Sequence, residues 1–140
     1  MNRFSGIPFR VSIAAVLLLV LGACSERRSD DPIQSYRLWS GQAPAKDVNV
    51  VHGKYWQSAH WTKEYILYLE LEVPPEWRNE FIRQNELVEA DSQWASPADV
   101  PGWFDPPETF RVWKSSKLNR DSRVFEDSTT GHMFIYDIQL

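Results

Sequence analysis

The clearest pattern in the chain is an alternation of apolar and polar residues over residues 64–73, E-Y-I-L-Y-L-E-L-E-V. Every second residue from Tyr65 to Val73 is apolar, and glutamates and a tyrosine occupy most of the positions between them. Side chains of a β-strand point alternately to its two faces, so this pattern predicts a strand with one buried face. The preceding residues 48–61 are rich in β-forming residues, and we expect them to supply an antiparallel partner.

A helix is predicted directly after this strand. Pro74 and Pro75 end the strand because proline has no N–H to donate to a neighbouring strand, yet proline is well tolerated in the first turn of a helix. Trp77, Phe81 and Ile82 then recur at helical spacing, with charged residues between them. We therefore expect a helix over residues 75–86 that packs one aromatic face on the sheet.

The remaining segments divide into loops and short strands. Residues 33–46 predict irregular structure or a short edge element, and residues 90–107, with four prolines and a glycine, predict a long loop. Residues 109–114 alternate like a strand, and residues 122–126 and 132–138 flank a turn that contains Gly131. The predicted fold class is α+β, an antiparallel sheet of about four or five strands with one helix packed across it.

The first 23 residues have a different character. Arg3 and Arg10 precede an apolar run over residues 11–23, which is too short to cross a membrane but is typical of a secretory signal. The run ends in Leu21-Gly22-Ala23-Cys24, which resembles the lipobox of bacterial lipoproteins. The alternative is an unmodified cysteine beside an ordinary signal cleavage site.

The lipobox resemblance implies a lipid anchor at Cys24. In that family the cysteine sulfur receives a diacylglyceryl group, the signal is cut before the cysteine, and further acylation, often with palmitate, follows. Two or more acyl chains hold a protein stably at a membrane. Ser25 after the cysteine favours the outer over the inner membrane under enteric-type sorting. The predicted organisation is a signal peptide over 1–23, a lipidated cysteine with a flexible tether over 24–32, and one periplasm-facing domain over 33–140.

Composition narrows the class of partner. Without the two signal arginines, thirteen basic residues remain against nineteen acidic ones, a net charge of about −6. Such a domain is not suited to nucleic acid, whose binding depends on neutralising phosphates, but it suits a basic protein. Cys24 is the single cysteine, so its acylation would leave none for a disulfide.

Candidate catalytic and metal-binding residues are few. His52 and His60 would lie about 26 Å apart on one continuous strand, so no metal site is predicted. Glu70 and Glu72, about 7 Å apart on one strand face, have a separation that glycoside cleavage can use, but alternate acids on a solvent-facing strand are ordinary. The chain has no nucleophile elbow and no glycine-rich phosphate loop, so neither a catalytic serine nor a cofactor is expected.

The predicted long loop supplies the candidate binding residues. Its prolines restrict the chain, which lowers the entropy cost of presenting Trp94, Trp103, Phe104 and Asp105 to a partner. Aromatic residues beside acidic ones are typical of a binding hot spot for a basic protein. In the alternative interpretation, Trp103 and Phe104 turn inward and cover the open side of the sheet.

The functional hypothesis is a membrane-anchored, non-enzymatic protein-binding module of the cell envelope. In general character the chain resembles small lipoproteins of Gram-negative bacteria, among which are immunity proteins that neutralise periplasmic toxins. An assembly or structural role is equally compatible with it. The alternatives are a lipoprotein that binds carbohydrate or peptidoglycan through exposed tryptophans, and a cell-wall hydrolase using Glu70 and Glu72.

Overall fold

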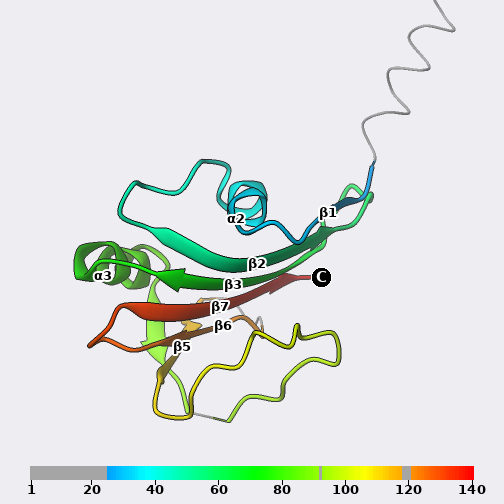
Figure 1. Cartoon of the computed structure of the whole chain (residues 1–140). Helices are drawn as coiled ribbons and strands as arrows, with labels where there is room; N and C mark the ends of the chain where they lie inside the picture. The colour runs from blue at the N-terminus through cyan, green and yellow to red at the C-terminus, as the bar shows by residue number, and fades with distance from the viewer. Residues whose placement is uncertain (1–24, 92, 118–120) are drawn as a thin grey trace, which may run out of the picture.

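The computed structural model describes residues 25–91, 93–117 and 121–140 (Figure 1). These residues form an α+β fold with one antiparallel sheet in the order β1-β2-β3-β7-β6-β5-β4. The strands are β1 (Arg27–Ser29), β2 (Asn49–Gln57), β3 (Tyr65–Glu72), β4 (Leu87–Glu89), β5 (Arg111–Ser115), β6 (Arg123–Glu126) and β7 (His132–Gln139), and the helices are α2 (Pro32–Ser40) and α3 (Pro75–Gln84). The predicted signal segment and Cys24 lie outside the described residues.

The predicted fold class is confirmed, while the predicted number of elements is wrong. The alternating segment forms β3, which pairs with β2 on one side and with β7 on the other. The hairpin of β6 and β7 and the helix α3 also lie where the pattern predicts them. However, the described residues form seven strands and two helices in place of four or five strands and one helix. Two of the additional strands, β1 and β4, have only three residues each.

Helix α2 lies in the segment that was expected to be irregular or an edge element. The Asp31 side chain accepts a hydrogen bond from the Gln34 backbone N–H at 2.7 Å, which caps the first turn. Pro32 occupies the start of the helix, and Gly41 ends it in the left-handed conformation with φ 77°. These start and stop signals define a helix of nine residues despite its weak apolar pattern.

Strand β1 lies within the segment that was expected to be a flexible tether. Arg27, Arg28 and Ser29 pair with Gln57, Trp56 and Tyr55 of β2. Backbone pairing to β2 therefore fixes this part of the chain at the edge of the sheet (Figure 1).

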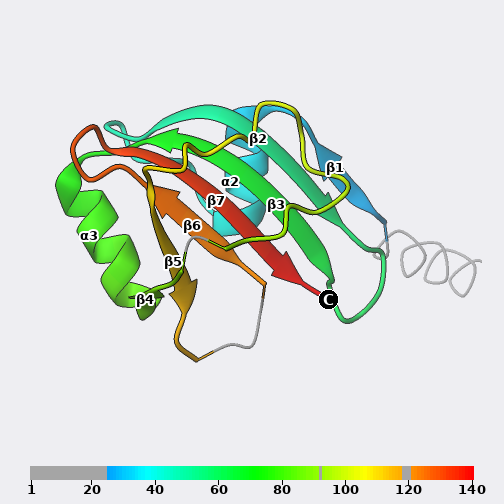
Figure 2. The ribbon, with the colours of Figure 1, turned by 90° about the horizontal axis from the view of Figure 1, so that it is seen from below.

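Both faces of the sheet are covered. One face packs against α2 and α3, and residues 93–110, from the connection between β4 and β5, run across the other face (Figure 2). We refer to these as the helix face and the loop face. Leu67, Leu69 and Leu71 of β3 point to the helix face and are fully buried. The prediction of a single buried face is wrong, because Tyr68, on the loop face, is only 1% exposed.

Polar contacts attach the connection to the loop face. The Tyr68 hydroxyl donates a hydrogen bond to the Asp99 carboxylate at 2.9 Å, and the Lys54 ammonium donates to the Asp99 backbone carbonyl at 3.0 Å. Burial, together with the hydrogen bond to Asp99, raises the pKa of the Tyr68 hydroxyl well above its ordinary value. The hydroxyl therefore keeps its proton and remains a donor to the connection.

Candidate ligand-binding groove

An open groove with a volume of about 670 Å³ lies on the helix face, between α2 and α3. Side chains from β3, β5, β6 and β7 form its floor, and the two helices form its walls. The aromatic side chains that line it on the helix face are those of Tyr36, Trp39, Tyr65, Trp77, Phe81 and Trp113. A concave surface with aromatic walls and a few polar groups is the usual form of a ligand site.

The two helical walls meet through their aromatic side chains. Trp77 and Phe81 lie one turn apart on α3, and their rings are stacked with centroids 5.1 Å apart and an interplanar angle of 7°. Trp39 of α2 lies 6.1 Å from Phe81 between ring centroids. These contacts extend the apolar core of the helix face into the groove.

A carboxylate orients two of the aromatic rings. Asp137 on β7 accepts hydrogen bonds from the Trp39 indole N–H at 2.9 Å and from the Tyr65 hydroxyl at 2.6 Å. The Ser122 hydroxyl donates to the other oxygen of the same carboxylate at 2.7 Å. Charge-assisted hydrogen bonds are stronger than neutral ones, so Asp137 fixes the tilt of both rings.

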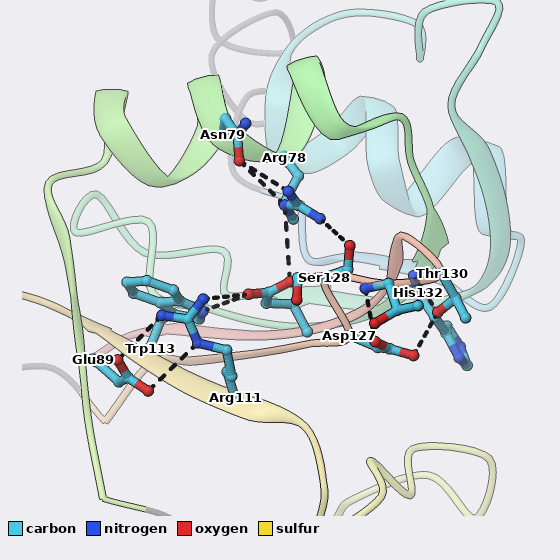
Figure 3. Close-up of polar contacts among 11 residues, drawn as sticks. Arg78, Asn79, Glu89, Arg111, Trp113, Asp127, Ser128, Thr130 and His132 are labelled. Carbon is cyan, nitrogen blue, oxygen red and sulfur yellow. Dashed lines mark hydrogen bonds and ion pairs between the residues drawn. The ribbon is translucent and has the colours of Figure 1, made fainter.

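A buried carboxylate orients a third ring, that of Trp113 on β5. Glu126 is 1% exposed, and its Oε1 accepts a hydrogen bond from the Trp113 indole N–H at 3.3 Å. Burial of a carboxylate is unfavourable unless positive groups lie close to it. Two arginines lie close to the Glu126 carboxylate. The guanidinium of Arg111 is 3.7 Å from Oε1, and the Nε of Arg78 on α3 is 3.9 Å from Oε2 (Figure 3).

The same two arginines also hold neighbouring groups. The Arg111 guanidinium lies over the Trp113 ring, 4.6 Å from its centroid, and donates a hydrogen bond to Glu89 at 3.2 Å. Arg78 donates to the Ser128 backbone carbonyl at 2.8 Å, which connects α3 to the turn between β6 and β7 (Figure 3). Hydrogen bonds therefore orient aromatic rings at both ends of the groove.

The four residues predicted for partner binding lie elsewhere, on the loop face. Phe104 is only 5% exposed, so it is a core residue and is not presented to a partner. Trp94 is half-buried against Phe104 and Phe125. The Trp103 ring stacks on His52 with centroids 5.0 Å apart, and Asp105 is exposed. The alternative interpretation, with Trp103 and Phe104 turned inward, describes this loop better.

Of the candidate histidines and glutamates, His52, Glu70 and Glu72 make side-chain contacts on the loop face, whereas His60 is exposed in the connection between β2 and β3. Glu70 is hydrogen-bonded to His52 at 2.6 Å through one oxygen and to His132 at 2.8 Å through the other. Glu72 accepts a hydrogen bond from the Asn49 amide at 2.8 Å. Of the residues that the structure describes, no three histidine, cysteine or acidic side chains converge as metal ligands.

Comparison with known proteins adds no assignment. No protein-family model, curated protein or solved structure matches the chain. The groove is not visible in the sequence, because its lining comes from seven elements that lie far apart along the chain. Trp39 and its hydrogen-bond partner Asp137, for example, are 98 positions apart. The chain contains seven tryptophans, three of which line the groove, and this high content is the sequence signal that could have indicated it.

Proposed function

We propose that this protein is a lipid-anchored, non-enzymatic binding module of the cell envelope that holds a protein partner in the groove between α2 and α3. The groove's preorganised aromatic lining is the observation that carries this proposal. The lipobox at Cys24 supports the membrane attachment, on the periplasmic side and preferably at the outer membrane. In the described ranges, neither helix is long and apolar enough to cross a membrane.

Preorganisation is what distinguishes the groove from an ordinary surface depression. Affinity is reduced whenever mobile side chains must become ordered on binding. The rings of Trp39 and Trp113 avoid this cost, because hydrogen bonds to the half-buried Asp137 and the buried Glu126 already fix them. Tryptophan is among the residues that contribute most to protein–protein affinity when a partner covers them. An apolar or aromatic side chain of a partner protein fits between these rings.

The charge of the domain favours a basic partner. The region after the predicted cleavage site carries a net charge of about −6. Opposite charges accelerate encounter and select among partners, whereas the groove itself supplies the apolar contact. We therefore expect the partner to combine an exposed apolar segment with surrounding lysine or arginine residues.

Affinity capture with matched variants tests this proposal. The mature, detergent-solubilised protein is incubated with envelope extract, and the retained proteins are compared with those of Trp77→Ala and Trp61→Ala. Trp77 lines the groove, whereas Trp61 is exposed outside it. We expect Trp77→Ala to weaken capture by about 2 kcal/mol, roughly thirtyfold, and Trp61→Ala to leave it unchanged. Equal capture by all three proteins would contradict the groove assignment.

A carbohydrate ligand is the second candidate function. Trp39, Trp77 and Trp113 are all half-buried on one surface, and the groove also contains amide and hydroxyl groups such as those of Gln42 and Ser122. Aromatic faces with hydrogen-bonding groups between them suit sugar rings. Retention of soluble peptidoglycan fragments by the wild-type protein, with loss on Trp77→Ala and no protein partner captured, would select this function over the first.

A further inference from the structure

Trp61 is the most exposed large apolar residue among those the structure describes, with 94% of its surface accessible. It lies in the connection between β2 and β3, which we call the β2–β3 tip (residues 58–64). The tip is an ordered turn, because the Ser58 N–H donates to the Glu64 carbonyl at 2.8 Å and the Lys63 N–H donates to the His60 carbonyl at 3.1 Å. This ordered turn therefore holds the indole ring of Trp61 in the solvent.

The strand register places this tip beside both ends of the described domain. Arg27 of β1 pairs with Gln57, the last residue of β2, and Gln57 also pairs with Tyr65, the first residue of β3. Tyr65 in turn pairs with Gln139 of β7. The chain toward Cys24, the β2–β3 tip and the C-terminal residue therefore leave the sheet at the same end (Figures 1 and 2).

The chain between Cys24 and the sheet is short. Only Ser25 and Glu26 separate the cysteine from Arg27, so Cys24 lies at most about 11 Å from the sheet along the chain. The Glu26 carboxylate also accepts hydrogen bonds from Arg28 and from the Trp56 indole, which holds this segment against β2. A lipid attached to Cys24 would therefore bring this end of the sheet to the membrane surface.

We propose that the β2–β3 tip docks on the lipid surface, with Trp61 placed in the interface between headgroups and acyl chains. This inference rests on the proposed lipid anchor at Cys24. Tryptophan is enriched at membrane–water interfaces because its ring is apolar and its N–H can still bond to water or headgroups. Leu140, 82% exposed at the same end, and Lys63, which can approach lipid phosphates, extend the contact.

Docking of the tip would orient the domain. A single flexible attachment leaves a domain free to rotate over the membrane, whereas a second contact restricts that rotation. With this end of the sheet on the lipid, the strands stand away from the membrane and the helix face, with its groove, remains open to the side (Figure 1). The tip therefore acts as a positioning contact for the groove.

A fluorescent label next to Trp61 tests the proposal. His60→Cys places a single reactive thiol on the tip of the lipidated protein, because the chain has one native cysteine and the proposed anchor would acylate it. The mature lipidated protein, labelled with a polarity-sensitive dye, is reconstituted in vesicles of phosphatidylethanolamine and phosphatidylglycerol. The matched control is the same label at Val88→Cys, an exposed position on the opposite edge strand β4. Flotation with the vesicles reports the anchor separately.

We expect the emission of the label at position 60 to shift to shorter wavelength in vesicles. The shift should be lost when Trp61→Ser is added, and the label at position 88 should show no shift. Equal emission at both positions in protein that floats with the vesicles would overturn the tip proposal and leave the anchor standing. If the emission of the label at position 60 shifts with protein concentration in the absence of lipid, the tip contacts a second copy of this protein, and the lipid-docking proposal is overturned. Failure to float would reject the anchor and, with it, the docking that rests on it.

Discussion

Replacing Phe104 with alanine tests whether the loop aromatics are core residues or a binding surface. The Phe104 side chain is 5% exposed, and its ring contacts Tyr68 edge-on at 5.2 Å and Phe134 at 5.4 Å between centroids. Trp94 and Phe125 lie further out, at 5.9 and 6.2 Å. The substitution would leave a cavity between the loop and the sheet, lined by rings that other contacts hold in place.

The expected cost follows from the burial of the side chain that is removed. Removal of a buried phenylalanine side chain costs about 3–5 kcal/mol, and edge-to-face ring pairs contribute beyond their buried area, so we expect about 4 kcal/mol for Phe104→Ala. A domain of this size has a free energy of unfolding of about 5–15 kcal/mol, so the variant still folds. With a urea dependence of about 2 kcal/mol per molar, the unfolding midpoint should fall by about 2 M.

The assay is equilibrium urea unfolding followed by circular dichroism, with Asp105→Ala as the control. Asp105 is the exposed neighbour of Phe104, and its substitution should change the free energy of unfolding by less than about 0.5 kcal/mol. A loss below about 1 kcal/mol for Phe104→Ala, with an unchanged urea dependence, would refute the assignment of Phe104 to the core.

Three further perturbations test other parts of the structure. Gly131→Ala places a Cβ 2.2 Å from the Val73 carbonyl oxygen at φ 77°, and we expect thermal unfolding to show a loss above about 1 kcal/mol. Glu126→Gln leaves Arg78, 12% exposed, without a carboxylate partner, and urea unfolding should show a loss of roughly 1–3 kcal/mol. The pKa of the Glu80 carboxyl is lowered to about 2, chiefly because Arg83 on α3 donates a hydrogen bond to it. The ionised Glu80 carboxylate therefore stabilises the folded state fully above its unfolded pKa of about 4.5, and this stabilisation is lost as the pH falls toward 2. Glu80→Gln should flatten the pH dependence of the free energy of unfolding over this pH range, measured by urea unfolding.

The sequence predicted the elements whose patterns are long and regular. Ten alternating residues identified β3, and paired prolines followed by helically spaced aromatics identified α3. The strands β1 and β4 could not be predicted from the sequence, because three residues are too few to show an alternation of apolar and polar positions. The sequence pattern also failed for α2, whose capping residues Asp31 and Gly41 were present but lay in a segment without a strong apolar face.

The candidate site was less predictable than the fold. The aromatic composition of the long loop is compatible with side chains that point either toward the sheet or into the solvent. Only the structure shows that the Phe104 side chain packs against the loop face of the sheet. The groove depends on contacts between distant segments, such as Trp113 with Glu126 and Trp39 with Asp137. No local pattern records such pairs, because each partner alone resembles an ordinary strand or helix residue.

Site-specific photo-crosslinking in living cells shows whether a protein partner occupies the groove. A photoreactive amino acid replaces Gln84 at the rim of the groove, Asp105 on the loop face, or Val88 on the edge strand β4. All three residues are exposed, so their replacement should leave the fold intact. We expect a crosslink to one dominant protein from position 84, and none to that protein from positions 105 and 88. Crosslinking of a dominant protein from position 105 and not from position 84 would contradict binding in the groove and would place the binding site on the loop.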